Sequence, residues 1–207
     1  MEKISDFVKK IASWQIIAFS AFFLVALFLL RGFWSYAAEN ISRSNETLVQ
    51  SRMTVSDFQQ ISMKADGDRL TSTDSDPQLI WQADQKITNI KFYMETSLYP
   101  GEIVVYYTTK DGEGFSENKR LWAHPADGED NWYVVELGLK DVRGLRIDPT
   151  MYAGNQMTFG TFVINEERTL SDYIAPDARR IFNLLLYTGI ISSVLRFVQE
   201  IFTKKFE

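Results

Sequence analysis

The chain contains no cysteine and a single histidine, His124, among its 207 residues. The absence of cysteine excludes a disulfide framework, a thiol catalyst and a cysteine-ligated zinc site. An exported domain of this chain must be held together by its core alone, which fits a bacterial cell-surface protein better than a small disulfide-rich module. The length suffices for one domain of ordinary size together with membrane segments.

The sequence also lacks the familiar catalytic motifs. It has no G-x-S-x-G elbow, no H-E-x-x-H pair and no glycine-rich phosphate loop. His124 precedes Pro125 in a predicted loop, where a histidine is more often a surface residue than a general base. Carboxylate pairs are common in any acidic region, so their presence here does not indicate catalysis. We therefore predict that the protein is not an enzyme.

Charge is distributed unevenly along the chain. The whole chain has a net charge of −5, whereas residues 57–168 contain 19 acidic and 11 basic residues. Phosphate binding needs clustered lysine and arginine, so the acidic middle predicts no nucleic-acid partner. Its simplest interpretation is a solvated surface. The ends are basic and flank apolar segments, which indicates contact with a lipid bilayer.

A long apolar run from Ile11 to Leu30 carries no charge over 20 residues. At about 1.5 Å per residue, such a helix spans the ~30 Å hydrocarbon core of a membrane. Trp14 lies near one end and Trp34 just beyond the other, where aromatic rings meet headgroups. The alternative is a cleaved signal peptide, for which Ala37 and Ala38 offer only a weak cleavage motif. We expect a retained transmembrane helix.

Basic residues around this run predict its direction. Lys3, Lys9 and Lys10 precede it, and Arg31 and Arg43 follow it. The narrow lysine excess predicts a cytoplasmic N-terminus and an extracytoplasmic main domain at the bacterial cell membrane.

The C-terminal segment has two interpretations. Asp177 is a reasonable helix N-cap, and Ile181–Leu195 runs 15 residues without charge. The helix either spans the membrane, with Arg196 near the cytoplasmic headgroups, or lies amphipathically in the interface. The uncharged length favours a second span. The expected organisation is a cytoplasmic N-terminus and transmembrane helix at 1–31, a stalk at 32–57, an extracytoplasmic β-sandwich at 58–170, and a membrane-associated helix at 171–207.

The middle of the chain has the alternation of half-buried strands. Ile90, Phe92 and Met94 fall on one face of a strand, and Leu145 and Ile147 on one face of another, whereas residues 102–108 are apolar on both faces and predict a central buried strand. Turn pairs such as Asp111-Gly112 separate seven or eight short strands. This pattern predicts a mainly β fold, an antiparallel β-sandwich of jelly-roll type.

The stretch from Gln78 to Asn165 resembles the jelly-roll β-sandwich modules attached to bacterial membrane proteins and to glycosyltransferases of surface-polysaccharide synthesis. The resemblance is carried by three short segments: Ile103-Val104-Val105-Tyr106-Tyr107, Phe115-Ser116-Glu117 and Leu145-Arg146-Ile147-Asp148-Pro149. The resemblance implies a jelly-roll β-sandwich fold and a setting in polysaccharide synthesis. A glycosyltransferase catalytic domain is absent from this sequence, so the resemblance implies no catalytic residue.

Aromatic residues at predicted outward or loop positions are candidates for binding sugar. Trp122, Trp132 and Tyr93 are expected to form a partly exposed platform for a glycan, because the C–H faces of sugars stack on flat rings. The alternative is that the two tryptophans seal one end of the core.

Two acidic clusters could supply the oxygen ligands that Ca²⁺ prefers. Aspartate is also a common turn residue, so a structural calcium is an alternative to the expectation of no cofactor. The clusters are Asp66, Asp68, Asp74 and Asp76, and Asp127, Glu129 and Asp130.

The sequence thus predicts a membrane-anchored, non-catalytic accessory protein of the bacterial envelope. Its expected task is to bind or position a surface glycan, or the membrane enzyme that acts on it. The alternative is a pure protein–protein scaffold subunit of a membrane complex. Either function implies a membrane-protein partner or a homo-oligomer, with contacts through polar and small helix residues such as Gly189 and Ser193.

Overall fold

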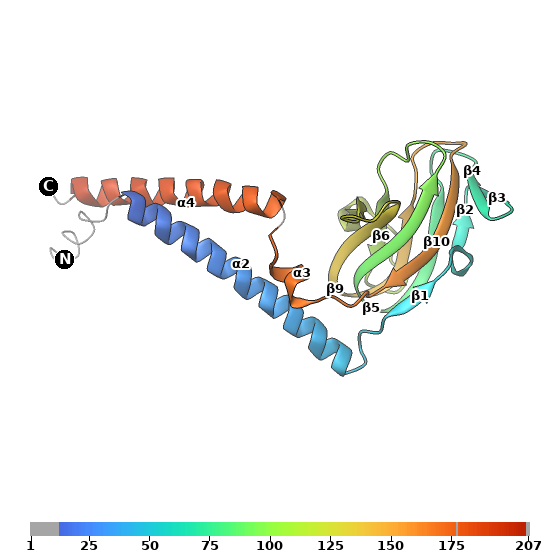
Figure 1. Ribbon diagram of the computed structural model, residues 1–207, viewed down its shortest axis with the longest axis horizontal. Helices are drawn as coiled ribbons and strands as arrows, with labels where there is room; N and C mark the ends of the chain where they lie inside the picture. The colour runs from blue at the N-terminus through green and yellow to red at the C-terminus, as the bar shows by residue number, and fades with distance from the viewer. Residues whose placement is uncertain (1–12, 177, 206–207) are drawn as a thin grey trace. The chain divides into compact units, whose positions relative to one another are not determined.

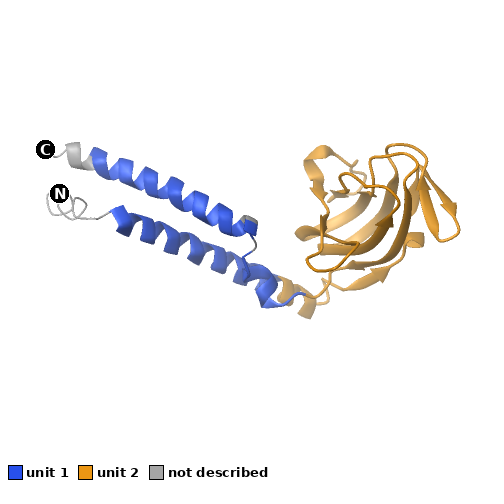
Figure 2. Ribbon diagram, turned by 45° about the horizontal axis from the view of Figure 1, so that its top comes forward, with its two compact units in different colours: residues 1–38, 168–207 blue, residues 39–167 orange. Residues whose placement is uncertain are grey.

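The computed structural model describes residues 13–176 and 178–205. The chain divides into two compact units (Figure 2). A helical unit combines Met1–Ala38 with Arg168–Glu207, and a β unit comprises Glu39–Glu167. Arg179 and residues 202–205 are described only through their backbone.

The described part of the helical unit contains most of α2 (Ser13–Ser44), whose last residues belong to the β unit, together with the short α3 (Leu170–Ile174) and α4 (Ala178–Lys205). Both α2 and Arg180–Ile201 within α4 are long and apolar enough to cross a membrane. The helix α2 does not end where the predicted span ends but continues to Ser44, so the first part of the predicted stalk is helical. At about 1.5 Å per residue, its 32 residues are longer than the hydrocarbon core requires.

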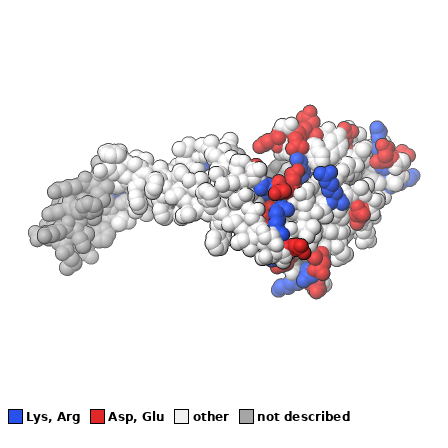
Figure 3. Space-filling model, turned by 60° about the horizontal axis from the view of Figure 1, so that its bottom comes forward, with Lys and Arg blue, Asp and Glu red and all other residues white. Residues whose placement is uncertain are grey.

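Apolar side chains on these helices remain largely exposed. Phe22 is 74% exposed, Trp34 78% and Leu185 69%. Charged groups are concentrated on the β unit, and the described surface of the helices carries few of them (Figure 3). A helix that is apolar on its outer surface suits a lipid environment better than water.

Close packing inside the helical unit involves a glycine and two tyrosines. A Cβ atom at Gly32 would come within 2.8 Å of Cγ2 of Ile174, so glycine permits the close approach of α2 and α3. The rings of Tyr36 and Tyr173 meet edge to face at 5.7 Å. Near the start of α2, Ser13 is hydrogen-bonded to Arg196 of α4.

The β unit is a ten-stranded sheet whose strand pairs are all antiparallel. Its main path runs β3-β4-β10-β5-β9-β6-β7, while β1 pairs with β10, β2 with β5 and β8 with β9. The strands are β1 (Ser51–Met53), β2 (Gln59–Ile61), β3 (Met63–Asp66), β4 (Arg69–Ser72), β5 (Gln78–Thr96), β6 (Val104–Thr108), β7 (Arg120–Trp122), β8 (His124–Pro125), β9 (Trp132–Asp148) and β10 (Gln156–Ile164). The first strand, β1, precedes residue 58, where the β domain was expected to begin.

Two long strands, β5 and β9, fold this sheet onto itself (Figure 1). Their pairing shifts register between Gln82 and Gln85 and again between Ile87 and Asn89, and such irregularities bend strands. Before the shifts, β5 pairs with β2 and with the end of β9. The end of β9 pairs in turn with β6, and β6 pairs with β7; we call these paired segments half A. After the shifts, β5 pairs with β10 and with the start of β9. On the far side of β10 lie β4 and then β3, and β8 pairs with the start of β9; we call these paired segments half B.

The core lies between the two halves. The ring of Phe58 contacts Trp81 of half A at 6.5 Å and Phe162 of half B at 4.6 Å between centroids. The predicted inward residues are fully buried: Ile90, Phe92 and Met94 on β5, and Leu145 and Ile147 on β9. This confirms a mainly β, antiparallel sandwich and the predicted register of both strands.

The expectation that residues 102–108 are buried on both faces is wrong. Val105 is completely buried, but Tyr106 on the opposite face of β6 is half-buried. The outer face of β6, beside the short edge strand β7, is covered only in part by the described chain: Val104 and Tyr106 are half-buried, whereas Thr108 is buried. This outer face is central to the candidate site.

A buried asparagine connects the two ends of the β unit. Asn165 follows β10 in a left-handed conformation with φ of 59°, and it is completely buried. Its Nδ2 donates to the carbonyl oxygens of Val49 (3.0 Å) and Lys86 (2.9 Å), and its Oδ1 accepts from the amide of Thr88 (2.9 Å). Arg43 donates to the carbonyl oxygen of Asn165 at 2.9 Å. The segments by which the chain enters and leaves the β unit are therefore both held at the same place on β5.

Candidate functional site

The structure places the three predicted glycan-binding aromatics on two different surfaces. Tyr93 and Trp132 are paired across β5 and β9 in half B, with ring centroids 5.7 Å apart in an edge-to-face arrangement. Trp122 lies on β7 in half A. Among the described residues no ring contact joins Trp122 to the other two. The structure brings together Tyr93 and Trp132 but not Trp122.

The Tyr93–Trp132 pair is closely surrounded. The Nζ of Lys91 lies 5.2 Å from the centre of the Trp132 ring and 2.7 Å from Glu129. A Cβ at Gly160 would come within 3.0 Å of the Cβ of Tyr93. A hydrogen bond from Tyr93 to Glu95 raises the pKa of the tyrosine. Both aromatic residues are half-buried.

The outer face of half A carries a denser set of aromatic and charged side chains. Tyr106 on β6 lies opposite Arg146 on one side and Arg120 on the other, and Val104 lies opposite Asp148 and Trp122. Since alternate residues of neighbouring strands share a face, these side chains form one surface. We call it the polar aromatic face, composed of Asp76, Glu102, Tyr106, Glu117, Arg120, Trp122, Arg146 and Asp148.

Arg146 is held firmly at the centre of this face. Its flanking residues Leu145 and Ile147 are completely buried, which fixes the backbone. The guanidinium donates two hydrogen bonds of 2.7 Å to Asp148 and one of 2.6 Å to Asp76, and lies 5.0 Å from the centre of the Tyr106 ring.

These contacts change the protonation behaviour of the ion pair. Burial alone would lower the pKa of Arg146, but the hydrogen bond and charge of Asp148, together with Asp76, outweigh it and raise the pKa. Burial raises the pKa of the Asp148 carboxyl, and Arg146 works against that rise. A bidentate pair of this kind presents donors and acceptors in a fixed arrangement.

Trp122 is the exposed ring of the polar aromatic face. Its residue surface is 42% exposed, and its Nε1 donates to Oε2 of Glu102 at 3.2 Å. The guanidinium of Arg120 lies 5.0 Å from the centre of the indole and forms an ion pair with Glu117. The hydroxyl of Tyr106 donates to Glu117 at 3.0 Å. Burial, followed by this hydrogen bond, raises the pKa of Tyr106.

Sequence reasoning missed Glu102, Tyr106, Arg146 and Asp148 as site residues of this face. Tyr106 was hidden because its strand was interpreted as buried on both faces. The outward positions of Arg146 and Asp148 were already implied by the inward alternation of Leu145 and Ile147. The segment of residues 145–149, which contains both residues, was used only to support the resemblance in fold. Whether two outward charges pair with each other and with Asp76 depends on long-range folding, which the sequence pattern does not contain.

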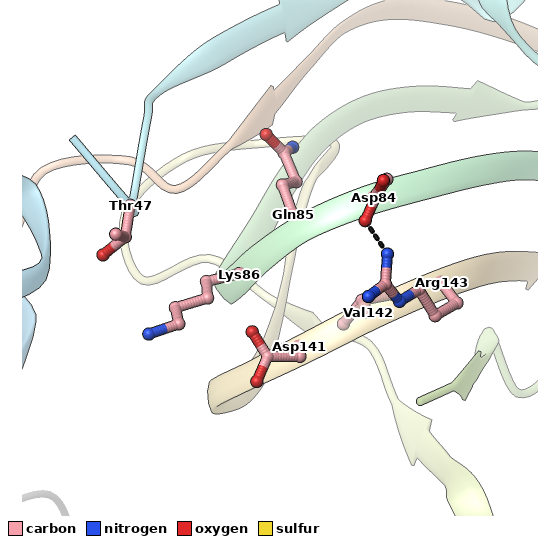
Figure 4. Close-up of a pocket in the computed structure, with 7 residues that line it drawn as sticks. All are labelled: Thr47, Asp84, Gln85, Lys86, Asp141, Val142 and Arg143. Atoms are coloured by element: carbon pink, nitrogen blue, oxygen red, sulfur yellow. Dashed lines mark hydrogen bonds and ion pairs between the residues drawn. The ribbon is translucent and has the colours of Figure 1, made fainter. Parts of the chain in front are cut away.

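A separate cleft of about 240 Å³ lies where β5 and β9 change register (Figure 4). Its charges are balanced: Asp84 forms an ion pair with Arg143, and Lys86 is paired across the strands with Asp141. It is lined by Thr47, Asp84, Gln85, Lys86, Asp141, Val142 and Arg143.

Three members of the acidic clusters considered for calcium, Asp74, Asp76 and Glu129, are engaged in other contacts. Asp74 accepts from the hydroxyl of Ser62 at 2.7 Å and from the amide of Asp76 at 2.8 Å, and these bonds lower its pKa. Glu129 pairs with Lys91. Within residues 13–176 and 178–205, no group of three or more acidic, histidine or cysteine side chains is placed to hold a metal ion. The expectation of no cofactor stays a prediction, with structural calcium as its alternative.

No protein-family model and no curated protein matches the sequence. Solved structures with a similar β unit include a xylan-binding CBM86 module from Roseburia intestinalis, with 12% identity over 56% of this chain and 94% of that chain, and a TM-score of 0.36. A family 29 carbohydrate-binding module has 7% identity over 62% and 97%, with a TM-score of 0.40. A β-1,3-glucan-binding CBM6 from Bacillus halodurans has 10% identity over 56% and 95%, with a TM-score of 0.33.

These neighbours are carbohydrate-binding modules, and none of the three is described as part of a membrane protein or a glycosyltransferase. At such identities and TM-scores the likeness carries no argument about what this chain binds. The sandwich fold rests on the strand registers and core contacts of the chain itself.

Proposed function

We propose that this chain is a membrane-anchored, non-catalytic glycan-binding protein of the bacterial envelope. The polar aromatic face of its β unit, which has a jelly-roll topology, holds the glycan. The observation that supports this most is the placement of Trp122 and Tyr106 on neighbouring strands beside a fixed arginine–carboxylate pair.

The chemistry of this face matches that of a sugar chain. The C–H faces of a pyranose stack on an indole or phenol ring, and its hydroxyls need both donors and acceptors. The guanidinium of Arg146 supplies donors, and the carboxylates of Asp148 and Glu117 supply acceptors. Because the ion pairs are already formed, little side-chain entropy is lost when a ligand binds.

Anchoring follows from the two apolar helices. We place α2 and Arg180–Ile201 across the membrane, with the β unit extracytoplasmic and both termini cytoplasmic. The two connections to the β unit are held at one place on β5 by Asn165, as expected if both spans enter the bilayer near each other. In this setting the protein positions a surface glycan for a membrane enzyme.

A second function is favoured by a different observation. Leu98, Tyr99, Met151 and Tyr152 are each at least 46% exposed, on two loops held by the buried Asn155. Rigid loops with exposed apolar side chains are typical of protein interfaces. On this alternative the chain is a scaffold subunit that works through protein contacts without sugar.

Glycan-array binding by the full chain in lipid nanodiscs tests the proposal. We expect at least one class of glycan to bind, and Trp122→Ala to weaken that binding about tenfold, equivalent to ~1.4 kcal/mol. The melting temperature of the variant should stay close to that of the parent chain, because Trp122 lies on an exposed edge strand. A folded chain that binds no glycan but co-purifies stoichiometrically with a membrane protein would support the scaffold instead.

A further inference from the structure

We infer that the polar aromatic face selects glycans with free amino groups over neutral glycans, and neutral over acidic ones. This inference rests on the proposed function and adds the charge class of the ligand. It follows from the balance of charges on the face and from the position of one carboxylate, Glu102.

The polar aromatic face has more carboxylates than cations. Its two cations are Arg120 and Arg146, and its four carboxylates belong to Asp76, Glu102, Glu117 and Asp148. Arg146 is bonded to both Asp148 and Asp76, and Arg120 to Glu117. Each cation on this face is therefore already paired, and the face carries an excess of two negative charges.

An acidic sugar meets an unfavourable environment here. A uronic-acid carboxylate at the edge of Trp122 would meet Glu102, and like charges at short range repel. The cation that lies over the indole, Arg120, is already paired with Glu117. Both cations of the face are already neutralised by carboxylates, so an acidic sugar would have to share Arg146 with Asp148 and Asp76, or Arg120 with Glu117. Sharing a cation brings like charges together, so the face disfavours acidic glycans.

Glu102 is the carboxylate suited to an ammonium group. Among the contacts of the described residues, it makes one neutral hydrogen bond, from the indole Nε1 of Trp122 at 3.2 Å, and no ion pair. A carboxylate has room for further donors beyond this bond. A sugar stacked on the exposed indole brings its ring substituents to the edge of Trp122, where Glu102 lies.

An amino group at that edge gains two interactions that a hydroxyl or an N-acetyl group lacks. The first is a charge-assisted hydrogen bond to Glu102, which is about twice as strong as a neutral one. The second is the general attraction of a positive charge to a face that carries an excess of two carboxylates. Arg120 already lies over the indole ring, so the ammonium group is expected at the edge beside Glu102 and not over the ring itself. Both interactions depend on charge, so the preference should weaken as salt is added.

Direct titration of the full chain tests this selectivity. The chain is held in nanodiscs of zwitterionic lipid, so that membrane charge does not bias the comparison. The probes are glucosamine, N-acetylglucosamine and galacturonic acid oligomers of equal length, titrated at a pH where the amino groups are protonated. We expect the amino oligomer to bind about tenfold more tightly than the N-acetyl oligomer at low salt, and the galacturonic oligomer to bind most weakly.

The variant Glu102→Gln keeps the shape of the side chain and its acceptor oxygen for Trp122. We expect it to bring the ratio of amino to N-acetyl affinity close to one. The matched control is Asp66→Asn, which removes one exposed carboxylate from β3 in half B and should leave the ratio unchanged.

The outcomes separate the inference from the proposed function. Equal affinity for the amino and N-acetyl oligomers, or tighter binding of the galacturonic oligomer, overturns the selectivity while glycan binding stands. An unaltered preference in Glu102→Gln also overturns it. If the chain binds none of the oligomers and no glycan on an array, the proposed function itself fails, and the selectivity fails with it.

Discussion

At the scale of single residues, the pair formed by Glu113 and Lys119 makes the stability of the β unit sensitive to acid. The Nζ of Lys119 lies 2.6 Å from Oε1 of Glu113, and the amide of Thr109 donates to Oε2 at 2.8 Å. The hydrogen bond from Lys119, followed by that from Thr109, lowers the pKa of Glu113 from 4.5 to about 2.

The sign of the effect follows from this lowered pKa. Because the folded chain holds the ionised carboxylate more firmly than the unfolded chain does, the stabilisation is complete above about pH 4.5 and is lost as the pH falls towards 2. We predict that Glu113→Gln has a lower melting temperature than the parent at neutral pH. The difference should shrink when melting is repeated in acid. A constant difference down to pH 2 would contradict this account.

The sequence predicted individual core residues better than individual site residues. Ile90, Phe92 and Met94 could be assigned because burial leaves a period of two in the sequence. The partnership of Arg146 with Asp76 has no such pattern, since the two residues are 70 positions apart and meet only through folding. Outward residues carry weak signals because solvent tolerates most side chains.

At the scale of elements, the end of β10 depends on Asn165. This residue satisfies three backbone groups on two segments and adopts a left-handed conformation that asparagine tolerates better than most residues. We predict that Asn165→Ala destabilises the full chain by at least about 2 kcal/mol, because it leaves buried groups without partners. The measurement is denaturant unfolding followed by tryptophan fluorescence.

Asn118→Ala is the matched control for this prediction. Asn118 is exposed in a short 3-10 helix, and surface changes of this kind stay within about ±0.5 kcal/mol. Equal stabilities of the two variants would show that the network around Asn165 does not hold the segments together.

Element positions were predictable where a strand is buried on one face and less so where it bends. The alternation of Ile90, Phe92 and Met94 indicated one short strand, whereas β5 begins at Gln78 and continues through two register shifts. A bulge interrupts the alternation, so the single long strand looks like two. Only the structure therefore revealed that one sheet, through the bends in β5 and β9, forms both halves of the sandwich. The more specific jelly-roll topology stays a prediction.

At the scale of the whole molecule, the account requires two membrane spans with both termini on the cytoplasmic side. The chain has no cysteine, so single cysteines can be introduced without other changes. We predict that Ser116→Cys, at an exposed position of the β unit, reacts with an impermeant thiol reagent in intact cells. Ser5→Cys, which lies outside the described residues, should react only after lysis. The opposite pattern would contradict the proposed orientation.

The central claim is that glycan binding belongs to the polar aromatic face and not to the Tyr93–Trp132 pair of half B. Titration of Trp122→Ala and Trp132→Ala with the glycan that the full chain binds best, each in nanodiscs, tests it most directly. Each affinity is scaled to the folded fraction, because Trp132 is half-buried and its loss also lowers stability. We predict that Trp122→Ala binds about tenfold more weakly, ~1.4 kcal/mol, whereas Trp132→Ala keeps its affinity within about twofold. A loss of binding in Trp132→Ala, with Trp122→Ala unaffected, would contradict the claim and move the site to half B.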